Sequence, residues 1–320
     1  MHSVPSPSTS RPSPVCGLLN LNKPVGVTSR RAVDMVQRLA RPAKAGHAGA
    51  LDPLATGVLV VCVGGATRLM EYVQRMPKRY VGTFLLGRQS ATEDIEGDVA
   101  ELPNAPVPAR EEIEAAAQRF IGRISQRPPA FSALKIRGRP AYKLARQGQP
   151  VALVARPIEI YRIAVQAYQY PELVLEIECG RGTYVRSLGR DLAESLGTAA
   201  VMSSLTRTAI GGFLLQQAVD PRELTADNWT AAVQTPLRAV GQLRRVQLSA
   251  EEATRIRNGL TIQLTGERAT GEAGPLAASP AAINTTEELA AVDADGQLVG
   301  ILCPDTGGQW RTLRNLPTGR

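Results

Sequence analysis

The sequence predicts an α+β fold whose main sheet is mixed or antiparallel. Strand-like apolar runs are interspersed with helix-like patterns, without the regular strand–helix–strand spacing that builds a parallel sheet. Residues 157–170 and 173–179 are two β-type runs joined by a turn at Pro171. A shift in composition near residue 236 indicates a smaller, β-rich unit at the C-terminus.

The elements of the N-terminal third follow from hydrophobic pattern and turn residues. Residues 17–21 are expected to form a short buried strand, and the continuous β-branched run at 58–63 predicts a central strand. Between them, Thr28 or Ser29 can cap a helix with apolar residues at Ala32, Val33, Val36 and Leu39. A second helix at 66–74 and a strand at 79–86 follow.

The remainder is expected to contain two more helices and a strand, at residues 108–120, 184–196 and 201–210. In the last unit, the Ser-Ala-Glu-Glu pattern from Ser249 is typical of a helix start. Residues 289–302 resemble a hairpin that turns at Asp295-Gly296.

We therefore expect a main domain over residues 15–236 and a β-rich domain over 237–320. The Ser- and Pro-rich residues 1–14 are expected to be a disordered tail. A flexible insertion is expected near 266–286, where Ala, Gly, Ser, Thr and Pro predominate. No apolar run reaches the roughly 18–20 residues that span a bilayer, which argues against a membrane protein.

The cysteine and histidine content argues against a metal or disulfide framework. The four cysteines are widely separated, with no C-x-x-C pair, at Cys16, Cys62, Cys179 and Cys303. The chain has only two histidines, His2 and His47, so a multi-histidine metal centre is excluded. We expect no metal, and a reducing cytoplasm as the location.

The charge distribution favours a polyanionic partner. The chain carries a net charge of +8. Residues 115–158 hold no acid and nine cations, and Phe131 and Tyr142 lie among them. Such a segment attracts a phosphate backbone. The alternative is a solvated face with an accidental bias, although solvated faces usually mix both signs.

The loop around Asp52 is the best candidate for chemistry. Residues 46–59 place Asp52 in a glycine-rich loop that leads into a buried strand. Pro53 restricts Asp52 to extended geometry, which would hold its carboxylate in one direction as a nucleophile or base. On spacing alone, an ordinary Asp-Pro turn is the favoured explanation of this segment.

A second acidic segment lies at residues 93–98, with the sequence Glu-Asp-Ile-Glu-Gly-Asp. Its carboxylates could suggest a cation site. We expect instead a solvated loop, because runs of charge usually lie on exposed surfaces.

The motifs along the chain closely resemble those of the tRNA pseudouridine-55 synthases, the TruB family. Residues 46–59 resemble its catalytic motif, and further matching motifs follow family order at residues 21–29, 78–80, 129–135, 141–148 and 179–188. The first motif departs mildly, because Asn22 stands where Asp is more usual. The C-terminal unit is similar to the PUA-like RNA-binding domain of bacterial members.

The resemblance implies roles for four catalytic residues. Asp52 matches the nucleophile, which attacks either the uracil ring or the anomeric carbon of the ribose. Arg186 matches the arginine that pairs with this aspartate. Tyr80 matches the residue that stacks on the target base, and Tyr184 matches a second active-site tyrosine.

The resemblance also implies residues that contact the substrate. His47 matches a histidine that occupies space in the RNA loop after the uridine flips out. Lys23 is expected to shape the pocket, and Leu205 and Arg207 match a late motif that lines it. The expected RNA contacts of the basic segment are Phe131, Lys135, Arg137, Arg139, Tyr142 and Arg146.

Together these features imply a cytoplasmic isomerase that acts on uridine-55 in the T stem-loop of tRNA. No cofactor and no obligatory protein partner are expected, and a monomer is sufficient. One alternative is an RNA-binding and folding protein without catalysis, but it would not need Asp52, Tyr80 and Arg186 together. Another is a nucleoside phosphorylase or similar small-molecule enzyme, which leaves the basic segment unexplained.

Overall fold

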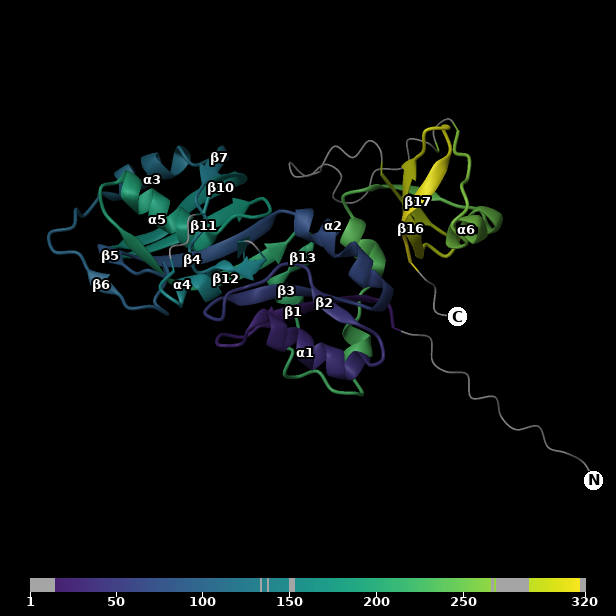
Figure 1. The fold of residues 1–320 in the computed structure, drawn as a ribbon, viewed down its shortest axis with the longest axis horizontal. Helices are drawn as coiled ribbons and strands as arrows, with labels where there is room; N and C mark the ends of the chain where they lie inside the picture. The colour runs from purple at the N-terminus through teal and green to yellow at the C-terminus, as the bar shows by residue number, and fades with distance from the viewer. Residues whose placement is uncertain are drawn as a thin grey trace, which may run out of the picture.

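The computed structural model of the chain describes residues 15–132, 134–136, 138–149, 153–265, 268 and 288–316. Within these residues, nine strands form one mixed sheet and four strands form a second sheet in a separate C-terminal lobe (Figure 1). The predicted α+β class is confirmed. The expected tail at 1–14, Arg137, and all of the expected insertion except Arg268 lie outside the described residues.

The main sheet is built mostly from antiparallel pairs. Its order is β1 (Gly17–Lys23), β3 (Thr56–Val63), β12 (Ala200–Ile210), β4 (Lys78–Leu86), β11 (Glu172–Cys179), β10 (Arg156–Gln169) and β7 (Gly122–Gln126). On its sides, β2 (Ala45–His47) pairs with β3, and β13 (Phe213–Leu214) pairs with β12. Within this order β3 and β12 alone are parallel, and the predicted β10–β11 pair is antiparallel.

Two short strand pairs lie beside the main sheet. One joins β5 (Arg88–Gln89) to β6 (Ala100–Glu101) and encloses the acidic segment. The other joins β8 (Lys135–Ile136) to β9 (Arg139–Pro140) and leads into α4 (Ala141–Ala145). The middle of the basic segment therefore forms local structure beside the main sheet, whereas β7 and the start of β10 place its ends within that sheet.

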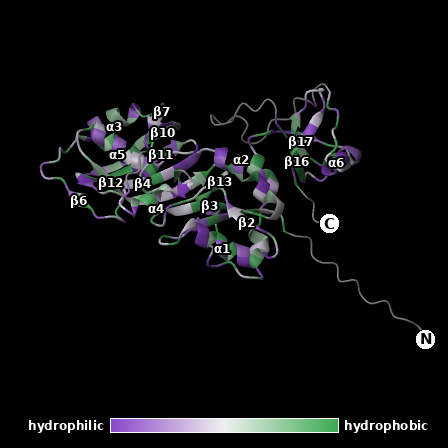
Figure 2. Ribbon diagram, viewed as in Figure 1, coloured by the Kyte–Doolittle hydropathy of each residue, from purple (hydrophilic) through white to green (hydrophobic). Residues whose placement is uncertain are grey.

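Strand β3 is covered on both faces, which explains its uninterrupted apolar sequence. Val58, Val60 and Cys62 pack into the same core cluster as α2 (Met70–Arg75) and the preceding 3-10 turn η1 (Gly64–Leu69). Leu59, Val61 and Val63 face the opposite side, under α1 (Ser29–Ala40). Helix α1 is amphipathic, with hydrophobic and hydrophilic residues on different faces (Figure 2).

The other half of the sheet is covered by α3 (Arg110–Gln118) and α5 (Val185–Ser195). Their buried residues share one core with β4, β10, β11 and β12. Helix α5 approaches β4 closely at Gly189, where a Cβ atom would lie 2.1 Å from the ring of Phe84. A larger residue at 189 would push α5 away from the sheet, so this glycine determines the depth of the helix.

The C-terminal lobe confirms the expected hairpin and helix start. Its sheet has the order β14 (Arg244–Gln247), β15 (Leu289–Val292), β16 (Leu298–Pro304) and β17 (Trp310–Asn315). The β15–β16 turn contains Gly296 at a φ of +73°. Ser249 caps α6 (Ala250–Arg257) and forms a capping box with Glu252. No helix in the described part of the chain is long and apolar enough to cross a membrane.

The C-terminal lobe shares buried surface with the main domain. The chain reaches it through short 3-10 turns, η2 (Leu215–Gln217), η3 (Trp229–Ala232) and η4 (Pro236–Val240). Ala290, Leu298 and Ile301 belong to the same core cluster as Val58 and Val60 of β3. Across the junction, the Arg68 guanidinium donates to the carbonyl of Asn315 at 2.6 Å. We infer that the lobe stabilises the main domain.

We predict that Ile301→Ala destabilises both parts together, because Ile301 is completely buried in their shared core. Loss of such a side chain costs about 2–5 kcal/mol. The chain has two tryptophans, Trp229 in the main domain and Trp310 in the lobe. In a Trp310→Phe background, the urea midpoint followed by Trp229 fluorescence should fall. A midpoint that Ile301→Ala leaves unchanged would show independent unfolding.

Candidate active site

Asp52 lies in the loop between β2 and β3, and the backbone around it is held by side chains. Ser29 Oγ accepts from the amide of Leu51 at 2.8 Å and donates to its carbonyl at 2.9 Å. The amide of Ala55 donates to the carbonyl of Asp52 at 3.1 Å. The helix cap is therefore Thr28, which accepts from the amide of Arg31, while Ser29 serves the loop.

Lys23 is completely buried at the end of β1 and binds carbonyl groups. Its ammonium donates to Val27 at 2.6 Å, to Pro24 at 3.0 Å and to Pro53 at 3.3 Å. It thus joins the turn after β1 to the residue that follows Asp52. Burial lowers the pKa of Lys23 to about 8, and the Asp52 carboxylate opposes that shift.

Arg207 of β12 holds the other side of the loop and contacts Tyr80. Its guanidinium donates to the carbonyls of Val58, Gly49 and Ala50 at 2.7, 3.0 and 3.3 Å. It also approaches the Tyr80 hydroxyl at 3.5 Å, with its central carbon 5.9 Å from the ring centroid. Arg207 and Tyr80 are direct partners across β12 and β4.

The predicted partnership of Asp52 and Arg186 is present. Arg186 Nε lies 3.0 Å from Asp52 Oδ2. The Arg186 side chain is 6% exposed, whereas the Asp52 side chain is 40% exposed. The arginine is thus a fixed, buried donor, and the carboxylate remains open to a ligand. A charge-assisted bond of this kind orients the carboxylate.

The acidic segment is only partly the solvated loop that we expected. Asp94 is 2% exposed and lies 3.2 Å from Arg186. The carbonyl of Thr92 accepts from the same guanidinium at 2.5 Å, and Glu93 pairs with Arg190. The expectation fails because α5 places two arginines against this loop. The charges of Glu93 and Asp94 are therefore paired and largely shielded from water, whereas Glu96 and Asp98 are exposed as expected.

Tyr80 and Leu205 line the same core as the catalytic loop. Tyr80 is 8% exposed and Leu205 is 7% exposed, and both cluster with Leu51 and Ala55. Burial raises the pKa of Tyr80, with a smaller opposing effect of Arg207, so its phenol is protonated at neutral pH.

Tyr184 and His47 occupy the margins of the site. Tyr184 directly precedes α5, and its ring centroid lies 5.9 Å from the guanidinium carbon of Arg156. Among the described contacts, none joins this ring to Asp52. His47 ends β2, and its buried Nδ1 atom has no hydrogen-bond partner in the described residues. Burial and then Arg207 lower the pKa of His47, which favours a neutral imidazole.

The predicted RNA-contacting residues begin at the active site and extend away from it. The carbonyl of Phe131 accepts from Arg186 at 3.1 Å. Lys135 lies in β8, and Arg139 in β9 donates to Gln147 at 3.0 Å. Tyr142 belongs to α4, and the exposed Arg146 directly follows this helix. The guanidinium carbon of Arg146 lies 5.7 Å from the centroid of the Tyr142 ring.

Three residues of the site escaped the sequence prediction: Ser29, Thr92 and Asp94. Ser29 was considered only as a helix cap, and Asp94 only as part of an acidic run. For Arg207, which the motif did identify, the strand pattern gives a second signal. Arg207 alternates with the apolar Leu205 and Ala209, which are buried, so its side chain lies on the same inward face of the strand. The partners of these groups come from distant parts of the chain, so local pattern does not reveal them.

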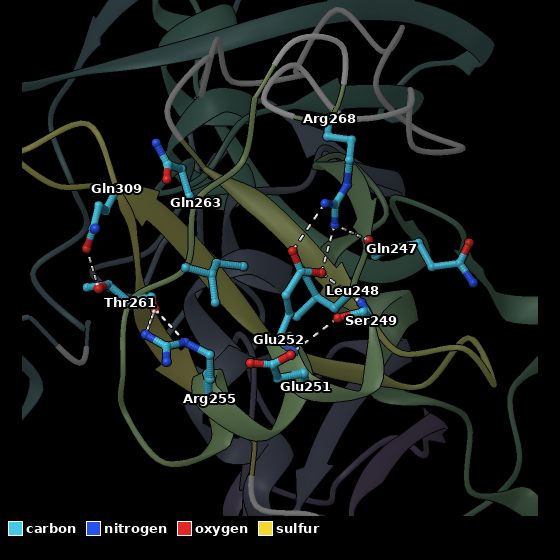
Figure 3. A pocket seen from close by; sticks show the side chains of 11 residues that line it. Gln247, Leu248, Ser249, Glu251, Glu252, Arg255, Thr261, Gln263, Arg268 and Gln309 are labelled. Carbon is cyan, nitrogen blue, oxygen red and sulfur yellow. Dashed lines mark hydrogen bonds and ion pairs between the residues drawn. The ribbon is translucent and has the colours of Figure 1, made fainter.

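Two further features concern metal and ligand binding. Among the described residues, no group of three or more His, Cys, Asp or Glu could hold a metal ion. A cavity of about 780 Å³ lies on the C-terminal lobe (Figure 3). Within it, Arg268 pairs with Glu252 at 2.8 Å, and Arg255 donates to the carbonyl of Thr261 at 3.0 Å. None of the predicted catalytic residues lines it.

The low pKa of Lys23 predicts a pH-dependent contribution to stability. Between pH 8 and about 10.5, the unfolded chain binds a proton at this lysine that the folded chain does not bind. The contribution of Lys23 to the free energy of unfolding therefore rises with pH, by at most about 1.4 kcal/mol per pH unit. The free energy of unfolding of the wild type minus that of Lys23→Met, both measured by urea denaturation, should increase from pH 8 to pH 10. Lys44→Met at an exposed position is the control, and a constant difference for Lys23→Met would contradict the assignment.

Comparisons with known proteins agree with this geometry. Residues 37–185 match the model described as "TruB family pseudouridylate synthase (N terminal domain)". The "tRNA pseudouridine synthase B" of Dehalococcoides mccartyi is 39% identical over 302 residues, which cover 93% of this chain and 95% of the relative. That of an Arthrobacter species is also 39% identical, with 91% and 94% covered.

Solved structures show the same fold. A Cbf5-Nop10-Gar1 complex contains a chain that aligns with a TM-score of 0.66 and 27% identity, covering 90% of this chain and 78% of that one. A chain of an H/ACA RNP bound to a substrate RNA containing 2'-deoxyuridine aligns at 0.67 and 22% identity, covering 95% and 85%. The second likeness concerns the fold alone. With a family match over the catalytic loop and 39% identity over nearly the whole length of its relatives, the chain belongs to the TruB family of pseudouridylate synthases.

Proposed function

We propose that this protein isomerises uridine-55 of the tRNA T stem-loop to pseudouridine, with Asp52 as the nucleophile. It is an isomerase of the tRNA pseudouridine synthase B type, as its relatives of 39% identity are named. The single observation that carries the residue assignment is the Asp52–Arg186 pair. It combines a fixed, buried guanidinium with a carboxylate that is 40% exposed.

The reaction requires one nucleophile and a uracil that stays bound after its bond to the ribose breaks. Asp52 attacks either the anomeric carbon or the uracil ring, and the bond between the ribose and N1 breaks. The uracil rotates, a bond forms between the anomeric carbon and C5, and the bond to Asp52 breaks so that its carboxylate is released. The C5 proton is lost while N1 gains one. Atoms and electrons balance without a cofactor. Arg186 orients the carboxylate, and the Tyr80 ring is proposed to lie beside the base.

Access to the uridine requires base flipping, because a stacked base cannot reach Asp52. Neutral His47 is suited to fill the space left in the RNA loop, and its pKa is lowered by burial. Tyr184 and Leu205 are proposed to bound the flipped base, and Lys23 to shape the pocket floor. Residues 131–146 are proposed to bind the phosphate backbone through their cations.

We also propose the division into a catalytic domain at 15–236 and an RNA-binding PUA-like domain at 237–320. The shared core suggests that the second domain is held in one orientation. The enzyme is proposed to act as a monomer without an obligatory protein partner. Four free cysteines support a reducing cytoplasm as its location.

We predict that Asp52→Asn abolishes turnover without loss of tRNA binding. An amide of the same shape cannot act as the nucleophile, so the rate should fall more than about 10³-fold. The assay is tritium release from tRNA that carries 5-tritiated uridine, beside a filter-binding curve. Asp98→Asn, at an exposed position of the acidic segment, is the matched control. Appreciable turnover by Asp52→Asn would refute the mechanism.

We further predict that Lys143→Gln and Arg146→Gln weaken tRNA binding and reduce its salt dependence. Both residues are exposed and belong to the basic segment. Each lost phosphate contact should lower the slope of log K against log salt by about 0.7–0.9. Arg222→Gln removes an exposed cation that pairs with Asp220 outside the segment, and should leave the slope unchanged. Equal slopes for all variants would remove this segment from the RNA interface.

A further inference from the structure

Helix α5 carries a second buried arginine one turn after Arg186. Arg190 lies four residues on, so both guanidinium groups project from the same face of the helix. The Arg190 side chain is 12% exposed. It pairs with Glu93 and with Asp191, and it donates to the carbonyl of Arg127 at 2.9 Å. The catalytic scheme above assigns it no role.

The partner of Arg190 lies between the two partners of Arg186. Thr92 and Asp94 both bind Arg186, and Glu93 stands between them. The Glu93 carboxylate accepts from Ser187 Oγ at 2.6 Å as well as from Arg190. The residue has a φ of +63°, which is uncommon for a side chain other than glycine. Its carbonyl also accepts from the amide of Met202 at 3.0 Å, so β12 holds the same point of the loop.

Arg190 also binds the backbone of the basic segment, at Arg127. The carbonyl of Arg127 binds Arg190, and the carbonyl of Phe131, four residues later, binds Arg186. The two arginines of α5 therefore bind the same pair of segments, the acidic loop at 92–94 and the residues at 127–131. Any movement of either segment changes the set of acceptors around Arg186.

We propose that Glu93 and Arg190 are positioning residues for the reaction, which rests on the proposed function of the Asp52 site. Their ion pair holds residues 92–94 and 127–131 against α5. This arrangement fixes the acceptors of the Arg186 guanidinium, and Arg186 in turn orients Asp52. Binding of RNA to the residues that follow Phe131 is thereby linked to the orientation of the Asp52 carboxylate.

The test compares Glu93→Gln, Arg190→Met and the double variant with the wild type. Glu93→Gln leaves Arg190 with Asp191 as its nearest carboxylate, and Arg190→Met leaves Glu93 and Asp191 without their shared cation, so each single variant should lower both stability and turnover. The double variant removes the Glu93 and Arg190 charges and leaves Asp191, which is 23% exposed, without its cation, so its stability should recover partly toward that of the wild type. Its single-turnover rate of tritium release should nevertheless stay about 10- to 100-fold low, as in the single variants. The dissociation constant for tRNA should change less than about threefold.

The measurements are made at a temperature at which circular dichroism shows every variant folded. The control pair is Arg162→Met with Glu176→Gln, which breaks an ion pair of 3.5 Å between β10 and β11 at 60% and 30% exposure. These control variants should keep wild-type rates. Their normal activity beside slow Glu93 and Arg190 variants supports a positioning role.

Two results would overturn the assignment. If the double variant recovers turnover together with stability, the pair serves folding alone. If the variants lose tRNA affinity and keep their single-turnover rate at saturating tRNA, the pair serves binding and does not position Arg186. A wild type that releases no tritium would instead overturn the proposed function, and the assignment with it.

Discussion

The orientation of the Asp52 carboxylate depends on hydrogen bonds to the backbone around it. Ser29, Lys23 and Arg207 bind successive peptide groups of residues 49–53 from three directions. Ser29 lies at the start of α1, Lys23 at the end of β1, and Arg207 within β12. A buried carbonyl without a donor is costly, so each contact stabilises the loop and the sheet together. The loop keeps one conformation because the surrounding elements supply these donors.

The electrostatic character of the site follows from the burial of its cations. Lys23 is completely buried and Arg207 is 2% exposed, and both donate mainly to carbonyl dipoles. Arg186 has two carboxylates, Asp52 and Asp94, one open and one enclosed. Water screens these charges little, so their field acts strongly on a bound ligand. A polyanionic RNA and a developing negative charge on uracil both suit such surroundings.

Helix α5 contacts both the candidate catalytic residues and the proposed RNA-binding segment. Helix α5 packs on β4 at Gly189 and presents its arginines to the acidic loop and to the start of the basic segment. At the other end of the sheet, the C-terminal lobe joins the core that underlies β3. Both proposed RNA-binding regions are thus attached to the strands that hold the catalytic loop.

The sequence by itself determined the elements and the main members of the site. A continuous β-branched run located β3, a pattern of 3.6 residues located α1, and ordered motifs pointed to Asp52, Tyr80 and Arg186 as candidates. Only the tertiary structure decided that Asp94 is buried, that Ser29 binds Leu51, and that the C-terminal lobe shares a core with β3. The reason is physical. Periodicity reports which face of an element is apolar, whereas the partner of a buried charge is set by packing between residues as distant as Thr92 and Arg186.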